Sequence, residues 1–215
     1  MNRRHLLIAG TAVGALGVFG AAAFIFGGKP PPEPVAPPHE STTLIRPHSP
    51  IVGPVGAPVT IVEFFDPACE SCRAFHPIVK QIMDQFPGKV RLVIRYTTFH
   101  RGSDEAVRIL ETARLQGMFL PVLEALLAAQ PQWAAHGAPQ LEAAWAAAAR
   151  GGLDVERARR ERLAPHIMAT LNADAADVAA LGVRRTPTFF VNGKPLLQFG
   201  PQHLLELVRQ EVGTK

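Results

Sequence analysis

The stretch EFFDPACESCRAFHP, Glu63 to Pro77, contains both cysteines of this 215-residue chain, Cys69 and Cys72. Two thiols separated by two residues are compatible with a redox pair, half of a metal site, a structural disulfide or chance packing. The element that carries the pair, and the compartment in which the chain resides, distinguish these alternatives.

The residues on either side of the cysteines predict a strand followed by a helix. Residues 57–66, APVTIVEFFD, form a short run of β-branched and aromatic residues, which is typical of a buried strand. Beyond Cys72, apolar residues recur at helical spacing as far as Phe86, and Pro77 is expected to kink this helix or to shift its first turns. Residues 89–96, KVRLVIRY, alternate as a second strand does. The cysteines are therefore expected at the helix entrance of a strand–helix–strand unit.

Helical patterns dominate residues 103–180. The first pattern has Ser103 as its expected N-cap and two acidic residues in its first turn. The last part of the block predicts two helices that are broken near Pro165. Trp133 and Trp145 are expected in the core of this block or as lids on it, because large aromatic side chains contribute most by being buried.

The C-terminal part predicts a hairpin and a helix. Strands are expected at residues 188–191 and 194–199, joined by Asn192-Gly193, the strongest short hairpin signal. Residues 201–212, PQHLLELVRQEV, have the spacing of an amphipathic helix. The resulting order is βαβ, a helical block, then ββα. It predicts an α/β fold with one sheet, helices on both of its faces, and a helical insertion at about 103–180 between the two halves.

The N-terminus predicts export across a membrane. After a basic start, residues 6–26 carry no charge, and 21 residues form a helix of about 31 Å, enough to cross a hydrocarbon core of about 30 Å. A cleaved signal is the alternative: Ala21 and Ala23 provide a small-residue cleavage site, and removal of the residues before about 24 would leave a soluble periplasmic protein. The uncharged run continues beyond these alanines, which favours a retained anchor at residues 1–26. The arginines before it keep the N-terminus in the cytoplasm and also resemble a twin-arginine signal.

Residues 27–42 predict a proline-rich linker, and residues 43–215 predict the folded domain. The net charge is only +4. The sequence also shows no obvious basic face for binding a nucleic acid. In residues 156–162, ERARRER, acids alternate with arginines, which is typical of a solvated helix face with ion pairs between neighbouring turns. Binding to nucleic acid is therefore not expected.

The position of the thiols predicts their chemistry. A thiol attacks a disulfide as its thiolate, and the amide groups at a helix N-terminus stabilise that anion. Cys69 is expected to attack or to be attacked from outside, whereas Cys72, one turn further on and more buried, resolves the mixed disulfide. Glu70 places a negative charge beside Cys69. We expect it to raise the pKa of Cys69 and to make the couple less oxidising.

GAPVTIVEFFDPACESCRAF, followed far downstream by TPTFFVNG, resembles the DsbA-like group of thioredoxin-fold disulfide oxidoreductases. The resemblance extends from Ser49 to the C-terminus and includes the helical insertion. It implies a thioredoxin fold and a thiol–disulfide oxidoreductase outside the cytoplasm, in the inner membrane facing the periplasm if the anchor is retained. The implied activity is disulfide exchange with cysteines of exported proteins. No cofactor is expected other than the redox-active disulfide of Cys69 and Cys72.

The resemblance also implies roles for three further residues. Thr186 and Pro187 match the pair whose proline is cis and lies against the active-site sulfurs, with Thr186 offering backbone hydrogen bonds to an extended substrate. Glu63 matches a buried acid that exchanges protons with Cys72, and its apolar surroundings predict a raised pKa. The Glu-Ser pair between the cysteines differs from the Pro-His of strongly oxidising members, so the direction of electron flow stays open.

A metal site is the competing hypothesis. His76 follows Cys72 by four residues, and two cysteines with one histidine can bind Cu(I) or Zn(II), as in a periplasmic copper-binding thiol protein. Structural zinc takes four ligands, and the sequence offers no fourth ligand at a matching spacing. The expected partners are exported substrates with cysteines and a membrane redox partner that recharges the pair. The linker is too short and proline-rich to form a dimerisation module, so a monomer is expected.

Overall fold

The computed structural model describes residues 41–135 and 137–214. The predicted anchor at residues 1–26 lies outside this part of the chain, as does nearly all of the predicted linker. No helix within the described ranges is long and apolar enough to cross a membrane. The first described element is the short helix α2, Ser41–Leu44.

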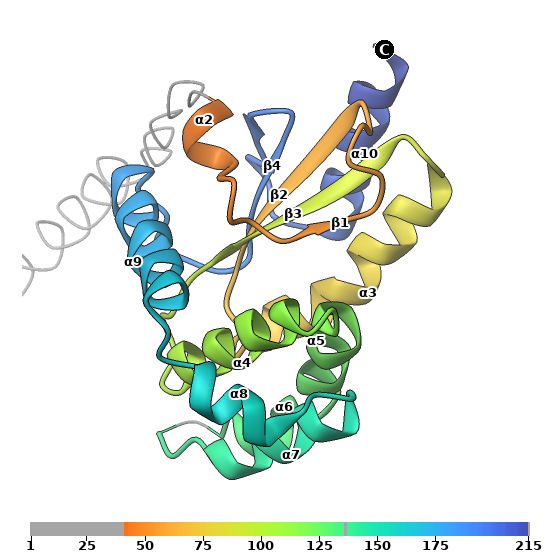
Figure 1. The fold of residues 1–215 in the computed structure, drawn as a ribbon. Helices are drawn as coiled ribbons and strands as arrows, with labels where there is room; N and C mark the ends of the chain where they lie inside the picture. The colour runs from red at the N-terminus through yellow and green to blue at the C-terminus, as the bar shows by residue number, and fades with distance from the viewer. Residues whose placement is uncertain (1–40, 136, 215) are drawn as a thin grey trace, which may run out of the picture. The chain divides into compact units, whose positions relative to one another are not determined.

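A five-stranded mixed sheet forms the centre of the domain (Figure 1). Its order is β1-β3-β2-β4-β5, with β2 and β3 parallel and every other neighbouring pair antiparallel. The strands are β1 Ile51–Val52, β2 Val59–Phe65, β3 Val90–Tyr96, β4 Thr188–Val191 and β5 Lys194–Pro195. All seven residues of β2 are buried, as expected for a central strand that is covered on both faces.

Helices cover the two faces of the sheet. The helix α3, Glu70–Gln85, connects the parallel strands β2 and β3, and it packs with α10, Pro201–Gly213, on one face. The helix α9, Pro165–Ala180, lies on the opposite face (Figure 1). Because successive side chains of a strand point to opposite faces, Ile61 faces α3 whereas Val62 packs near α9. The same alternation places Glu63 on the α3 face.

The helices between β3 and β4 form the predicted insertion, most of which gathers beyond one end of the sheet (Figure 1). Besides α9 they are α4 Ser103–Leu115, α5 Phe119–Ala128, α6 Gln130–Trp133, α7 Leu141–Arg150 and α8 Val155–Glu161. Trp133 and Trp145 are buried in their core, and α9 begins at Pro165, as predicted.

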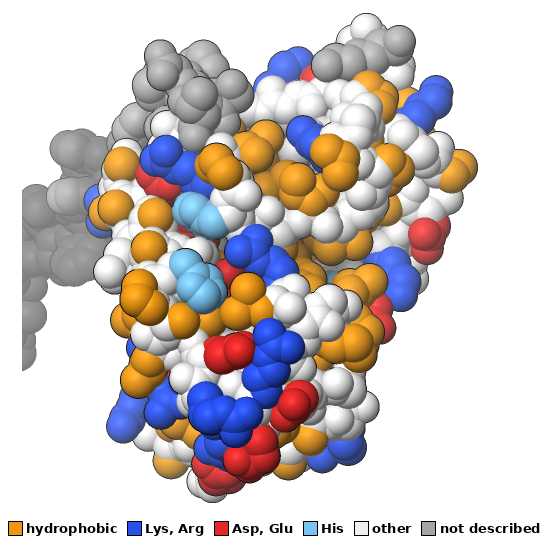
Figure 2. Space-filling model, in the orientation of Figure 1, with side chains coloured by type: hydrophobic (Ala, Val, Ile, Leu, Met, Phe, Trp, Pro, Cys, Tyr) orange, Lys and Arg blue, Asp and Glu red, His pale blue; other side chains and the backbone are white. Residues whose placement is uncertain are grey.

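The charged run at residues 156–162 lies on and just after α8. Figure 2 shows basic and acidic side chains intermixed over this part of the surface. Arg157 pairs with Glu161 at 2.9 Å along the helix, and Arg159 pairs with Glu142 at 2.5 Å. The predicted solvated face with ion pairs is therefore observed.

Two local predictions were wrong. Gly102, with φ +85°, is the N-cap of α4 in place of Ser103, whose hydroxyl donates to the Asp66 carboxylate instead. The second hairpin strand ends at Pro195 rather than at residue 199. The hairpin register would place Gln198 opposite Pro187, which has no N–H to donate, so the ladder cannot extend that far.

Three further observations concern the hairpin turn, the helix α3 and the strand β1. Asn192 and Gly193 both have positive φ and connect β4 to β5, so the predicted hairpin turn is present. The helix α3 continues without interruption through Pro77. The two-residue strand β1 is too short to give a sequence pattern and was not predicted.

Candidate active site

Cys69 is the N-cap residue of α3, and Cys72 lies in the first turn of the same helix. Both are free thiols, and both are buried. The hydrogen bond from the Cys72 thiol lowers the pKa of Cys69 to about 5, and amide groups of Ser71 and Cys72 at the helix N-terminus act in the same direction against the effect of burial. The Cys69 sulfur is therefore held largely as a thiolate at neutral pH.

Thr186 and Pro187 lie on the other side of the Cys69 sulfur. Cys69 Sγ is 3.3 Å from the carbonyl oxygen of Thr186, and the Thr186–Pro187 peptide bond is cis. This contact joins residues 117 positions apart in the sequence. The backbone of Thr186 thus borders the sulfur that an external substrate would reach.

Cys72 and Glu63 form the buried part of the site. Cys72 is fully buried and accepts a hydrogen bond from the Asp66 amide at 3.4 Å. Burial, the contact with Cys69 and the charge of Glu63 raise the pKa of Cys72 far above its usual value. Cys72 therefore keeps its proton unless another group accepts it.

Glu63 has the properties of such an acceptor. Its side chain is buried, and burial, with a smaller contribution from Cys69, raises its pKa to about 8. Its Oε1 atom has no hydrogen-bond partner among the described residues. Glu63 raises the pKa of Cys72, and Cys69 raises the pKa of Glu63, so the three groups influence one another electrostatically.

Asp66 is a site residue that sequence reasoning missed. Its fully buried carboxylate accepts hydrogen bonds from the amides of Ala68 at 2.9 Å and Phe99 at 2.8 Å, and also from the Ser103 hydroxyl. Its own amide donates to Cys72. Asp66 therefore fixes the cysteine loop to the loop that follows β3. The available signal was an acid at the end of a buried strand, three residues before the first cysteine.

His100 and Gln130 are held at the same site from two other segments. His100 Nδ1 lies 2.9 Å from Asp66 Oδ2, and although burial opposes it, this contact raises the pKa of His100. Gln130 donates to the carbonyl oxygens of Pro67 at 2.8 Å and Cys69 at 3.0 Å. No sequence pattern identifies Gln130 as a site residue, because its position depends on how the helical insertion packs against the cysteine loop.

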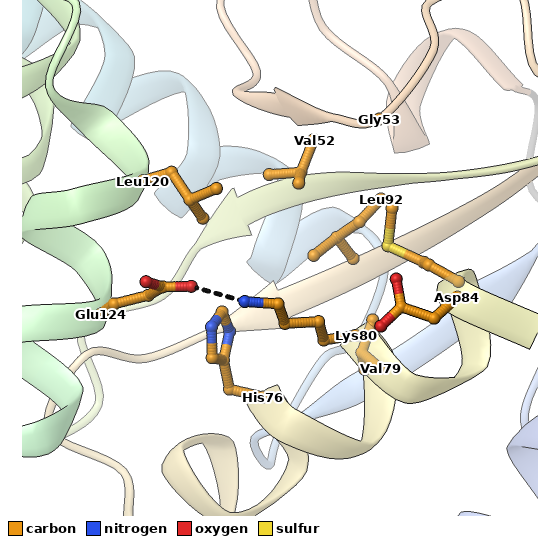
Figure 3. Close-up of a pocket in the computed structure, with 10 residues that line it drawn as sticks. Val52, Gly53, His76, Val79, Lys80, Asp84, Leu92, Leu120 and Glu124 are labelled. Atoms are coloured by element: carbon orange, nitrogen blue, oxygen red, sulfur yellow. Dashed lines mark hydrogen bonds and ion pairs between the residues drawn. The ribbon is translucent and has the colours of Figure 1, made fainter. Parts of the chain in front are cut away.

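His76 lies on the side of α3 that faces α5. It lines a cavity of about 170 Å³ between α3 and α5, beside the ion pair of Lys80 and Glu124 at 3.1 Å (Figure 3). Burial lowers its pKa. The described ranges contain no group of three or more His, Cys, Asp or Glu side chains placed to hold a metal ion.

Comparisons with known proteins agree with this geometry. A family model described as thioredoxin matches residues 46–208. A thioredoxin-like oxidoreductase from Silicibacter pomeroyi DSS-3 superposes with a TM-score of 0.70 at 28% identity, over 82% of this chain and 99% of that one. Wolbachia pipientis alpha-DsbA1 gives 0.69 at 18% identity, over 80% and 94% of the two chains.

A curated relative adds a different context. The Na(+)/H(+) antiporter NhaA of Herminiimonas arsenicoxydans is 34% identical over 146 residues, which are 68% of this chain but 22% of that protein. The chain therefore spans about a fifth of that relative. From the family match and the structural likeness, the chain belongs to the thioredoxin family and has its DsbA-like fold, with a helical insertion between the two halves.

Proposed function

We propose that the protein is a thiol–disulfide oxidoreductase that exchanges disulfides with cysteines of exported proteins. The observation that carries this proposal is one helical turn with two free thiols of opposite character. The pKa of Cys69 is lowered to about 5, whereas that of Cys72 is raised. The Cys69 sulfur is thus the nucleophile and leaving group, and the Cys72 sulfur resolves the mixed disulfide.

The oxidising direction illustrates the chemistry. A substrate thiolate attacks Cys69 Sγ of the disulfide form, which breaks the Cys69–Cys72 bond and releases Cys72 as a thiolate. Protonated Glu63 supplies the proton that Cys72 then carries. A second substrate thiolate attacks the substrate sulfur of the mixed disulfide and releases Cys69, so two electrons pass from the substrate dithiol to the protein. The reducing direction is the reverse.

Thr186 and Pro187 would position the substrate. Their backbone borders Cys69, so an extended segment that pairs with Thr186 places its own cysteine at the attacking sulfur. No cofactor takes part in the proposed exchange apart from the Cys69–Cys72 disulfide. Ion transport is not part of the proposal, because the chain spans only 22% of the related antiporter.

The proposed location is outside the cytoplasm, at the inner membrane or in the periplasm, where a membrane redox partner recharges the cysteine pair. This part of the proposal depends on the uncharged N-terminal run at residues 6–26. We propose that the protein acts as a monomer.

The test is the equilibrium of the Cys69–Cys72 couple with glutathione, combined with the oxidation of a dithiol peptide and the reduction of insulin. We expect Cys69→Ser to abolish all three reactions and Cys72→Ser to accumulate a mixed disulfide with the peptide. Alkylation of Cys69 over a pH series should be half-maximal near pH 5. A wild-type protein that neither oxidises nor reduces these substrates would refute the proposal.

A further inference from the structure

Two arginines directly precede the residue that borders the attacking sulfur. Arg184 and Arg185 lie in the loop between α9 and β4, next to Thr186, whose carbonyl oxygen is 3.3 Å from Cys69 Sγ. Both side chains are exposed. Neither forms an ion pair with any residue in the described part of the chain.

The backbone that carries these arginines is fixed on both sides. On one side, Val183 is buried and its amide donates to the carbonyl oxygen of Val178 at 3.0 Å. On the other side, the Thr188 hydroxyl donates to the carbonyl oxygen of Arg185 at 2.8 Å. The backbone of Arg184 and Arg185 is therefore held beside the active site, while their side chains face solvent.

Most other arginines of the described residues are engaged within the protein. Arg46 and Arg95 bind the carboxylate of Asp177, and Arg101 donates to the carbonyl oxygen of Gly137. Further arginines with internal partners are Arg73, Arg91, Arg108, Arg114, Arg157, Arg159 and Arg162. Within the described ranges, Arg150, Arg160 and Arg209 are exposed without such a partner, as Arg184 and Arg185 are, but the latter two directly precede the residue that borders Cys69 Sγ.

We propose that Arg184 and Arg185 select substrates whose reactive cysteine is flanked by aspartate or glutamate. This inference rests on the proposed function, because the substrate must pair with Thr186 in extended form. Flanking side chains of such a segment come within reach of the two guanidinium groups. A guanidinium presents a planar fork of donors that matches a carboxylate, so an acidic neighbour is favoured over a basic one.

The other charged groups at the site modify this preference. Glu70, between the cysteines, is exposed and opposes an acidic substrate, whereas His100 favours one when it is protonated. Asp66 is buried and already accepts hydrogen bonds from His100 and Ser103, so it faces no substrate. The two arginines carry two positive charges against the single charge of Glu70.

Exposed charges act mainly on the encounter rate, and salt weakens them. Charge complementarity accelerates association at low ionic strength, and the screening length falls from about 30 Å at 0.01 M salt to about 3 Å at 1 M. A preference caused by Arg184 and Arg185 must therefore diminish with added salt, whereas a preference caused by shape would not.

The experiment compares two dithiol peptides that differ only in the residues next to the target cysteine, two aspartates in one and two lysines in the other. The full-length protein in its disulfide form is mixed with each peptide, and the second-order rate constant of oxidation is measured at 10 mM and 500 mM salt. At 10 mM salt we expect the aspartate peptide to react about tenfold faster than the lysine peptide, and at 500 mM salt within about twofold.

The double variant Arg184→Glu/Arg185→Glu should invert the ratio of the two rate constants. The matched control is Arg160→Glu/Arg209→Glu, which changes the net charge equally at exposed positions on α8 and α10 and should keep the wild-type ratio. Because each ratio is taken within one protein, a partly unfolded variant does not mimic the effect.

Equal rate constants for the two peptides, or a ratio that the control changes as much as the test variant, would overturn the inference and leave the proposed function intact. If neither peptide reacts with the wild-type protein and glutathione does not reduce it, the proposed function itself fails.

Discussion

Two ionisable side chains lie on neighbouring strands in the middle of the sheet and face opposite sides. Glu63 of β2 is opposite Ile94 in the parallel ladder, and Arg95 of β3 is opposite Phe64. Both side chains are buried, the arginine completely. Glu63 and Arg95 differ in the partners that surround them. Arg95 holds the fold together, whereas Glu63 is available for chemistry.

Arg95 has a full set of partners on the α9 face. It donates to Asp174 at 2.8 Å, to Asp177 at 2.6 Å and to the carbonyl oxygens of Thr43 at 2.6 Å and Leu44 at 3.0 Å. It thereby links β3, α9 and α2. A buried charge that is paired and hydrogen-bonded in this way contributes to holding these elements in place.

Glu63 faces the α3 side and has one oxygen without a partner among the described residues. Buried polar atoms are nearly always hydrogen-bonded, so an exception calls for an explanation, and such exceptions are concentrated at functional sites. Here the charge of the carboxyl group raises the pKa of Cys72, the thiol that must gain and lose a proton. Burial alone therefore does not identify a functional acid, and at Glu63 burial is combined with an unsatisfied oxygen and an electrostatic effect on Cys72.

The largest expected effect is on the structural side of this comparison. Arg95→Met removes the fully buried partner that Asp174 and Asp177 share, so we expect a loss of about 3–5 kcal/mol in the free energy of unfolding. Urea denaturation measures it. The control is Arg46→Met, since Arg46 pairs with Asp177 but is partly exposed, and a much smaller loss is expected there. Equal losses in the two variants would contradict the assigned role of Arg95.

On the chemical side, Glu63→Gln removes the proton donor and acceptor without changing the shape of the side chain. We expect disulfide exchange with a dithiol peptide to slow by about 100-fold, a typical value for loss of a general acid or base. Stopped-flow fluorescence or quenched alkylation would follow it. The free energy of unfolding should not decrease, in contrast to Arg95→Met, and an unchanged exchange rate would exclude Glu63 from the proton transfer.

The raised pKa of Glu63 also predicts a pH dependence of stability. The unfolded carboxyl ionises near pH 4.5, whereas the folded one ionises near 8, so the unfolded state binds fewer protons between these values. The stability of the wild type relative to Glu63→Gln should therefore fall as the pH rises from about 4.5 to 8, by at most about 1.4 kcal/mol per pH unit, and stay constant above.

This measurement should use the disulfide form. In the reduced protein the lowered pKa of Cys69 acts with the opposite sign, because its thiolate stabilises the folded state progressively as the pH rises from about 5 to 9. Burial, the main cause of the shift at Glu63, does not depend on the charge of Cys69. A flat difference between wild type and Glu63→Gln would show that Glu63 is solvated in solution.

The smallest effect is expected at Glu70, the exposed acid between the two cysteines. Glu70→Gln removes a negative charge beside Cys69, which favours the thiolate and makes the couple more oxidising. Because Glu70 is exposed, the change should stay below about 30 mV, the equivalent of about one pKa unit. The glutathione equilibrium measures it, and a more reducing variant would contradict the assigned effect of Glu70.

Local sequence determined much of the architecture. The buried strand, the helix that starts at Cys69 and the Asn-Gly hairpin each depend on residues that are close in the chain, so spacing and turn chemistry predict them. The family resemblance located Thr186 and Pro187 opposite the cysteines. The failure at Ser103 came from a distant partner: its hydroxyl does not cap α4, because it donates to Asp66, 37 positions away.

Only the tertiary structure decided which polar groups are satisfied. Arg95 meets Asp174 from 79 positions away, and Gln130 reaches Cys69 from 61 positions away. Periodicity carries no information about such pairs, because desolvation and hydrogen bonding depend on which distant segments pack together. The sequence therefore specified the two thiols and the helix that activates one of them. Folding alone left Glu63 with an unsatisfied oxygen among the described residues and brought Thr186, with the two arginines that precede it, to the Cys69 sulfur.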